Sequence, residues 1–290
     1  MAKILVTGAK GQLGNELFEI SKKNKNHQFF YTDIDDLDIL DKEMVKEFIS
    51  GLKPNYLINC AAYTAVDKAE QEQELAEKVN FEAVKNISSV CKYQNVRLIH
   101  ISTDYVFDGT SCVPYVENTK VNPISVYGKT KLKGEKAVLA SSDSLEAIII
   151  RTSWLYSSFG NNFVKTILKY GKERNELKVV FDQIGTPTYA RDLAKAIIEI
   201  IDYSENKNEF KKGIYNFSNE GVCSWYDFAN EIVSFAKIDC IIKPIRTIEY
   251  PTAAIRPAYS VLDKSKIKSS FNIEIPYWKN SLKDCLKKIK

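Results

Sequence analysis

The amino-acid sequence predicts an α/β protein, in which a doubly wound parallel sheet carries a smaller, interleaved C-terminal α+β subdomain. In the first half of the 290-residue chain, short apolar runs alternate with helical patterns, as expected for parallel strands joined by crossover helices. A glycine-rich turn links the first apolar run to the first helical pattern. From about residue 161 onward, shorter pieces replace this regular alternation. With 44% apolar residues, the chain has enough material for such a core.

The glycine-rich turn predicts a Rossmann-like dinucleotide site. The run Lys3–Thr7 ends in the pattern Gly8-x-x-Gly11-x-x-Gly14, and residues 15–20 then begin a helical pattern. Small residues let the backbone approach a pyrophosphate, and the free N–H groups of the helix N-terminus point at it. A tight strand–helix turn without a ligand is the alternative interpretation.

Acidic residues at the end of the second expected strand, Phe29–Asp33, bear on the choice of cofactor. Asp33 lies about 20 residues beyond the glycines, where an acid accepts hydrogen bonds from the adenosine ribose. Residues 34–38 add further acids and no arginine. Because a 2′-phosphate would meet repulsion here, NADH is favoured over NADPH. The alternative is that these acids belong to a solvated loop.

Further apolar runs complete the expected sheet. They span residues 56–62, 96–102 and 145–152, and helical patterns at 44–50 and 70–93 precede the first two of them. The run 145–152 is almost entirely apolar, as expected for a strand that is buried on both faces. The run 96–102 delivers Ser102-Thr103-Asp104 at its C-terminal end, which is the edge where open α/β sheets bind ligands.

The segment Tyr127-Gly128-Lys129-Thr130-Lys131 predicts acid–base chemistry. If Tyr127 opens a helix, Lys131 lies one turn further along the same face. A phenol with a pKa of about 10 is a poor catalyst at neutral pH, and a nearby ammonium would lower that pKa by stabilising the phenolate. The pair would then suit proton transfer in carbonyl–alcohol chemistry. Tyrosine and lysine are also common on solvated helix faces, so the pair gains its weight from Ser102-Thr103-Asp104 upstream.

Longer motifs extend along the whole chain. They are Thr-Gly-x-x-Gly-Gln-Leu-Gly at 7–14, Asn-Cys-Ala-Ala-Tyr-Thr-Ala-Val-Asp-Lys-Ala-Glu at 59–70, Ser-Thr-Asp-Tyr-Val-Phe-Asp-Gly at 102–109, Val-Tyr-Gly-Lys-Thr-Lys at 126–131 and Arg-Thr-Ser-Trp-Leu-Tyr at 151–156. They continue with Asn161-Asn162-Phe163, Asp182-Gln183-x-Gly185-x-Pro187-Thr188 and Arg256-Pro257. Together they resemble the dTDP-4-dehydrorhamnose reductase family of extended short-chain dehydrogenase/reductases, over essentially the full length.

The resemblance implies NAD(P)H-dependent reduction of the C4 keto group of dTDP-4-dehydro-β-L-rhamnose to dTDP-β-L-rhamnose, the last step of dTDP-rhamnose biosynthesis. It implies that Tyr127 donates the proton, that Lys131 keeps the phenol acidic and binds the nicotinamide ribose, and that Thr103 stabilises the developing oxyanion. The implied cofactor-binding residues are Gly8, Gly11, Gln12, Leu13, Asp33, Asp38, Ile39, Ala61, Ala62, Tyr63, Tyr127 and Lys131. The implied substrate-binding residues are Thr103, Asp104, Trp154 and Arg256.

Two of the implied substrate-binding residues also have a structural interpretation that needs no substrate. Trp154 would cover the apolar face of the deoxy-hexose, but it could instead be a core aromatic residue. Arg256 would fork onto the diphosphate oxygens, but it could equally form a surface ion pair.

The resemblance also implies how the chain is divided. A dinucleotide-binding domain is expected at residues 1–152 plus about 175–203, and an interleaved sugar-nucleotide subdomain at about 153–174 and 204–290. Some family members form a dimer around a magnesium ion held by acids, one of them just after the Thr-Pro-Thr turn. Here Arg191 stands in that neighbourhood, although Glu16 could still serve. We therefore predict no metal requirement, and a monomer or a homodimer.

Composition argues against several other classes of protein. The formal charge of +4 is small for this length and its charges are interspersed, so neither nucleic-acid binding nor a polybasic membrane patch is expected. The N-terminus runs straight into a strand pattern, and no stretch approaches the roughly 18 apolar residues of a membrane span. Six scattered cysteines without a Cys-x-x-Cys pair indicate reduced thiols in a cytoplasmic protein. With only His27 and His100, a histidine metal cage is not expected.

Two rival functions remain open. A reductase or epimerase of another nucleotide-linked keto-sugar would use the same catalytic residues and differ only in its C-terminal pocket. A non-catalytic regulatory subunit on the same fold would be expected to lose part of the glycine turn or of the Tyr/Lys pair. This chain has Thr103, Tyr127, Lys131 and the glycines together.

Overall fold

A six-stranded parallel sheet forms the centre of the computed structural model, which describes residues 1–289. Its strands are β1 (Lys3–Thr7), β2 (Gln28–Thr32), β3 (Tyr56–Asn59), β4 (Arg97–Thr103), β5 (Ala147–Thr152) and β10 (Gly213–Phe217). They run side by side in the order β10-β5-β4-β3-β1-β2, so the winding reverses between β1 and β3. Every residue of β3 and β5 is buried, because helices cover both faces of the sheet. The predicted doubly wound α/β fold is confirmed.

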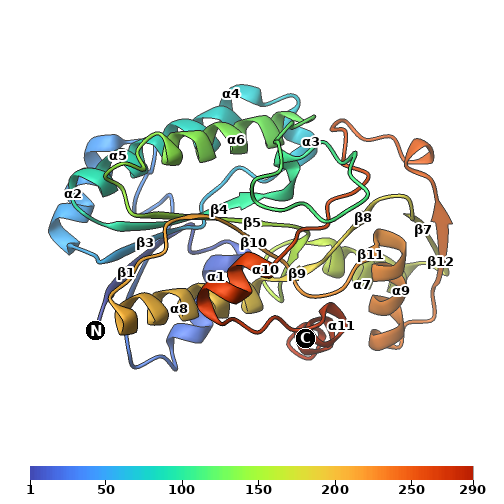
Figure 1. The fold of residues 1–290 in the computed structure, drawn as a ribbon. Helices are drawn as coiled ribbons and strands as arrows, with labels where there is room; N and C mark the ends of the chain where they lie inside the picture. Colours follow the sequence, from blue (N-terminus) through green and yellow to red (C-terminus); the bar gives the residue numbers. More distant parts are fainter. Residues whose placement is uncertain (290) are drawn as a thin grey trace.

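Two layers of helices enclose the sheet (Figure 1). One layer contains α1 (Gln12–Ser21), α8 (Ala190–Lys207) and α10 (Ser265–Phe271), and the other contains α2 (Lys42–Leu52), α5 (Ala83–Tyr93) and α6 (Val126–Leu139). Each helix turns an apolar stripe toward the strands: Leu17 and Ile197 pack in the first layer, and Val45 and Ile87 in the second. Burial of these two apolar interfaces holds the sheet and therefore its ligand-binding edge in place.

A second cluster of elements lies beside the carboxyl edge of the sheet (Figure 1). It contains α7 (Phe163–Glu173), α9 (Trp225–Ala236), α11 (Trp278–Leu286) and three two-stranded pairs. The pairs are β7 (Glu176–Val180) with β12 (Ile241–Ile245), β8 (Ile184–Gly185) with β11 (Cys223–Ser224), and β6 (Leu155–Tyr156) with β9 (Thr188–Tyr189). These elements share a separate apolar core around Phe228 and Trp278.

Two strands pair differently from what the sequence pattern indicated. β10, expected within the C-terminal subdomain, pairs with β5 and is the outermost strand of the central sheet. β7, expected with the dinucleotide-binding domain, pairs with β12 in the smaller cluster. Both strands are only five residues long, so their own pattern cannot specify which sheet they join. The division of the chain into two domains stays a prediction.

The long helix expected over residues 70–93 is interrupted. The chain forms α3 (Val66–Ala69), α4 (Gln73–Glu77), a π-helical turn η1 (Lys78–Glu82) and then α5. Buried Asn80 explains the interruption, because its side chain accepts from the Tyr63 N–H at 2.9 Å and donates to the Thr130 hydroxyl at 3.2 Å. A π-helical turn at such a place is a frequent companion of functional sites. The short 3₁₀ turns η2 (Asp104–Val106) and η3 (Thr247–Glu249) complete the elements.

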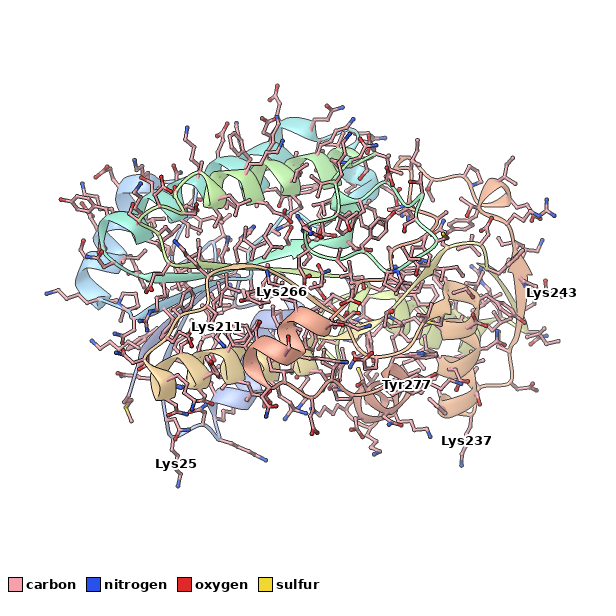
Figure 2. The ribbon with its side chains drawn as sticks, viewed as in Figure 1. Lys25, Lys211, Lys237, Lys243, Lys266 and Tyr277 are labelled. Atoms are coloured by element: carbon pink, nitrogen blue, oxygen red, sulfur yellow. The ribbon has the colours of Figure 1, made fainter. Side chains whose placement is uncertain are left out.

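Three expectations drawn from the composition concern surface charge, membrane-spanning helices and cysteine pairing. Figure 2 shows Lys25 projecting outward beside the central sheet, and Lys237 and Lys243 projecting outward from the smaller cluster. Within residues 1–289, no helix is long and apolar enough to cross a membrane. All six cysteines are unpaired.

Candidate active site

A cavity of about 520 Å³ lies at the carboxyl ends of β1, β3, β4 and β5. Because these strands are parallel and in register, the residues that follow them meet at one edge. Ten of the predicted site residues line it: Gly8, Gly11, Gln12, Leu13, Ala62, Thr103, Asp104, Tyr127, Lys131 and Trp154. The others, which are Asp33, Asp38, Ile39, Ala61, Tyr63 and Arg256, lie outside its lining.

The glycine turn has no room for side chains. Gly8 has a φ of +70°, and a Cβ on it would lie 2.6 Å from the Ala61 nitrogen. A Cβ on Gly14 would lie 2.4 Å from the Gly8 carbonyl oxygen. The turn leads into α1, whose N-cap residue Gly11 makes no side-chain hydrogen bond, so the first N–H groups of the helix are left for another acceptor. This backbone cradle fits the pyrophosphate of a dinucleotide.

Three of the predicted cofactor residues follow β3. Ala61 lies behind Gly8 and donates its N–H to Asn59 Oδ1 at 3.1 Å, while Ala62 faces the cavity. Tyr63 is turned away, because its backbone is tied to Asn80 and its hydroxyl donates to Glu72 Oε2 at 2.5 Å. The close approach of Gly8 to Ala61 therefore explains why small residues follow this strand.

The acidic loop after β2 is paired with a cation from the glycine turn, which the sequence pattern did not reveal. Asp33 Oδ2 accepts from the Lys10 N–H at 2.8 Å, and the Lys10 ammonium forms an ion pair with Asp35. Asp38 accepts from the Leu40 N–H at 2.9 Å, and Ile39 packs against the core under α2 and α5. Lys10 brings positive charge next to the acids that were expected to repel a 2′-phosphate.

The first turn of α6 sets the position of Tyr127. Ser125 caps this helix, and its Oγ accepts from the Gly128 N–H at 3.1 Å. Gly128 permits close packing, since a Cβ there would lie 2.2 Å from the Tyr105 carbonyl oxygen. Lys131 and Glu135 follow at successive turns, and both are buried. The expected face carrying Tyr127 and Lys131 is therefore present and points into the protein.

The electrostatics of the pair differ from the expectation. Lys131 Nζ donates to the Ile101 carbonyl oxygen at 2.7 Å, and burial lowers its pKa to about 8, an effect opposed by the Glu135 charge. Burial raises the pKa of Tyr127 to about 12, and the nearby Thr103 hydroxyl offsets only part of this. The prediction that the lysine lowers the pKa of the phenol is wrong for the protein alone, because burial dominates and raises that pKa.

Thr103 and Asp104 complete the polar wall opposite the glycine turn. The Thr103 hydroxyl donates to Asp104 Oδ1 at 3.0 Å and accepts from the Tyr105 N–H at 3.2 Å. Asp104 is buried, and this burial raises the pKa of its carboxyl group to about 6. Its second oxygen, Oδ2, has no partner among the described residues, so it can accept from or donate to a ligand in the cavity.

A buried ion pair supports α6 from behind. Arg151 on β5 donates from Nε and Nη2 to the two oxygens of Glu135, at 2.9 and 2.7 Å. Glu135 also accepts from the Ser102 hydroxyl at 2.6 Å. Both charged side chains are at most 2% exposed, so each depends on the other for compensation of its charge. The pair ties the helix that carries Lys131 to β5, and the Ser102 hydroxyl ties the same helix to the end of β4.

Two tryptophans form the far wall of the cavity. Trp154 stacks on Trp225, the first residue of α9, with ring centroids 3.6 Å apart and ring planes 10° apart. Trp154 thus lies at the cavity as expected, but one of its faces is already covered. Trp225 was missed, since a tryptophan at the start of a helix has no local feature that marks it as part of a site.

Arg256 is engaged in an ion pair. Its Nη2 lies 2.6 Å from Asp67 Oδ2 and its Nη1 lies 3.1 Å from Asp67 Oδ1, while the Ala254 N–H donates to the same carboxylate. The pair joins α3 to the segment before α10. The structure therefore places Arg256 in the ion pair that was the alternative interpretation.

Glu16 is also paired with a cation. It is fully buried on α1, accepts from the Ser157 hydroxyl at 2.7 Å, and lies 3.3 Å from Arg191 Nη1. Within residues 1–289, no group of three or more His, Cys, Asp or Glu side chains is placed to hold a metal ion. Arg191 supplies Glu16 with positive charge from within the chain.

The fold and this cavity define the class of the protein. A doubly wound sheet brings a glycine cradle, a buried Tyr/Lys pair and a threonine to one edge, as in Rossmann-like oxidoreductases of the short-chain dehydrogenase/reductase type. The family model described as the RmlD substrate binding domain matches residues 2–290. The chain belongs to this family, and several of its relatives are dTDP-4-dehydrorhamnose reductases.

Relatives and solved structures cover nearly the whole chain. The dTDP-4-dehydrorhamnose reductase of Aggregatibacter actinomycetemcomitans is 42% identical over 98% of each chain. The crystal structure of a dTDP-4-dehydrorhamnose reductase from Clostridium acetobutylicum is 45% identical, with a TM-score of 0.91 and 98% of each chain covered. That of the Bacillus anthracis enzyme in complex with NADP is 38% identical, with a TM-score of 0.92 and 99% covered. A dTDP-4-keto-6-deoxy-D-glucose reductase of Streptomyces niveus is 33% identical over 96% of this chain and 94% of its own.

Proposed function

We propose that this chain catalyses the NAD(P)H-dependent reduction of the C4 keto group of dTDP-4-dehydro-β-L-rhamnose to dTDP-β-L-rhamnose. The observation that supports it best is the meeting of Thr103, Tyr127 and Lys131 with the glycine cradle around one cavity. The family assignment supports the choice of a dTDP-linked 4-keto-6-deoxy sugar as substrate. A regulatory subunit is disfavoured, because the catalytic group and the cradle are both intact.

The proposed roles follow from the position and protonation of each side chain. When bound, the reduced nicotinamide supplies the hydride. Tyr127 is protonated at neutral pH, because burial raises its pKa to about 12, and it donates its proton to the sugar oxygen. Thr103, whose hydroxyl donates to Asp104 Oδ1 in the protein alone, would turn its single proton to the same oxygen. Lys131 binds the nicotinamide ribose from its buried position, and its positive charge opposes the rise in the pKa of Tyr127 once ligands displace water.

The proposed contacts with the substrate come from Asp104 and from the two tryptophans that line the cavity. Asp104 has a free oxygen for a sugar hydroxyl, and the tryptophan wall offers an apolar surface to the deoxy-hexose. Arg256 is proposed to reach the diphosphate only by giving up its ion pair with Asp67. In this exchange the guanidinium would leave the two oxygens of the Asp67 carboxylate and bind two oxygens of the diphosphate.

The proposed function is tested by NADH and NADPH oxidation with a panel of nucleotide-linked keto-sugars. We expect the highest kcat/KM with dTDP-4-dehydro-β-L-rhamnose. A higher value with dTDP-4-keto-6-deoxy-D-glucose would instead support the activity named for the Streptomyces niveus relative. Absence of turnover with every sugar, in a protein that still binds NADH, would contradict the reductase assignment and support the regulatory subunit.

The cofactor preference gives a separate prediction. We expect NADH to have a higher kcat/KM than NADPH, because the loop after β2 carries Asp33, Asp35 and Asp36, which outnumber Lys10. Replacing Asp33 by Ser removes one repulsive charge and should move the NADH-to-NADPH ratio toward NADPH by about tenfold. The exposed Asp143→Ser, far from β2, is the matched control. A wild-type enzyme that strongly prefers NADPH would contradict the assignment of the acids.

Metal dependence gives another prediction. We expect EDTA to leave activity unchanged, because the Arg191 guanidinium lies beside Glu16 where an acid would be needed for a metal site. Activity that is lost in EDTA and restored by magnesium would show that the prediction is wrong. Whether the chain acts as a monomer or a homodimer stays a prediction, to be checked by light scattering in the same two buffers.

A further inference from the structure

The Trp154 backbone has an unusual conformation. Its φ is +48°, in the left-handed region that bulky residues rarely adopt. Two hydrogen bonds hold it there: the Thr188 N–H donates to the Trp154 carbonyl at 3.2 Å, and the preceding Ser153 hydroxyl donates to the Thr186 carbonyl at 2.8 Å. A conformation that is costly in itself persists where the surrounding structure fixes it, and here it aims an indole at the cavity.

The Trp154 ring is held from two sides. Trp225 covers one face in the stacked geometry described above, and Phe163 packs on Trp225 with centroids 4.6 Å apart. Gly185 lies against the ring as well, since a Cβ on it would lie 2.7 Å from ring atoms Cε2 and Cζ2 of Trp154. The indole therefore fits a slot that is lined by a flat aromatic face and by a residue without a side chain.

A single structural unit supplies both sides of this slot. Gly185 pairs with Cys223 in the β8–β11 pair, and Ser224 at the end of β11 is the N-cap of α9, directly before Trp225. Ser224 and Asp227 form a capping box that fixes where α9 begins. The position of Trp225 is thus set by secondary structure and not by the cavity that it lines.

We propose that Trp225 is a positioning residue for the sugar-nucleotide site, which holds the Trp154 indole in its slot and so sets the wall on which the 6-deoxy-hexose lies. The inference rests on the proposed function and extends it to a residue that affects substrate binding through Trp154. The apolar face of a deoxy sugar packs well on a fixed indole, and a mobile indole would lose entropy on binding. Trp225 therefore affects binding of the sugar nucleotide more than the chemical step.

The test changes each of the two residues that hold the Trp154 indole, Trp225 and Gly185. Trp225→Leu removes the flat ring on which Trp154 stacks, and Trp225→Phe keeps a smaller ring there. Gly185→Ala places a methyl group against ring atoms Cε2 and Cζ2 of Trp154. We expect Trp225→Leu and Gly185→Ala each to raise KM for the keto-sugar about tenfold, with kcat within about threefold and the Kd of NADH unchanged. Trp225→Phe should recover most of the loss. Trp278→Phe, a buried change in the same aromatic core but outside the cavity, is the control and should leave KM unchanged.

A binding readout keeps this test separate from turnover. In a Trp278→Phe background the stacked pair provides all tryptophan emission, and dTDP-β-L-rhamnose should change it on titration. The half-saturating concentration should rise about tenfold when Trp225→Leu is added. An unchanged midpoint, together with an unchanged KM in both Trp225→Leu and Gly185→Ala, would overturn the inference. If wild-type protein turns over no keto-sugar but the midpoint still shifts, the proposed function fails and the positioning role stands.

Discussion

Replacing Tyr127 by Phe is expected to lower kcat by about 10² or more while leaving the Kd of NADH unchanged, because the lost hydroxyl is the proposed proton donor and the other cofactor-binding residues remain. Tyr127 lines the cavity beside Thr103, and burial keeps it protonated at neutral pH. The loss should therefore be in the chemical step. Single-turnover NADH oxidation separates that step from binding and product release.

Tyr105→Phe is the matched control for this change. Tyr105 also lines the cavity, and its ring meets the Tyr127 ring edge-on with centroids 5.4 Å apart. Removing its hydroxyl should lower kcat much less, since Tyr105 has no role in proton transfer here. Near-normal turnover by Tyr127→Phe, or equal losses in the two variants, would end the assignment of Tyr127 as proton donor.

Replacing Arg151 by Met is expected to destabilise the protein by about 3–5 kcal/mol, the usual cost of leaving one partner of a buried ion pair without its counter-charge. Arg151 makes both charged hydrogen bonds to Glu135, and neither side chain can reach water. The free energy of unfolding from urea titration measures the loss. Lys131, one turn before Glu135, would then face an uncompensated carboxylate.

The double variant Arg151→Met/Glu135→Leu provides the control. Because it removes both charges, it should recover much of the lost stability. Equal destabilisation in the single and double variants would assign the cost to packing. A single variant within about 1 kcal/mol of wild type would contradict the view that the pair compensates buried charges.

Most of the central sheet could be predicted from local patterns. The runs before Gly8, Cys60, Ser102 and Ser153 are apolar and separated by crossover-length segments, so their parallel pairing follows from general rules. The pairing of β10 and β7 could not be predicted, because neither strand belongs to the regular alternation of strands and crossover helices in the first half of the chain. The break in the helix at residues 78–82 depends on Asn80 reaching Tyr63, a contact 17 residues away in sequence.

The site was predictable where its residues belong to continuous motifs. Thr103, Tyr127 and Lys131 do, and the structure brings them to one cavity. Lys10, Glu135 and Trp225 were missed, since each matters through a partner on another element. The direction of the Tyr127 pKa shift was wrong for a related reason: helical spacing shows which charge is near, but not how much water is excluded.

The most direct test of the central claim follows one hydrogen atom. Wild-type protein is supplied with NADH deuterated at the transferring C4 position of the nicotinamide and with dTDP-4-dehydro-β-L-rhamnose, and the sugar product is examined by NMR. The account predicts dTDP-β-L-rhamnose carrying one deuterium at C4 of the sugar. Oxidation of the cofactor without deuterium at that carbon, or a label at another carbon, would contradict the proposed reduction.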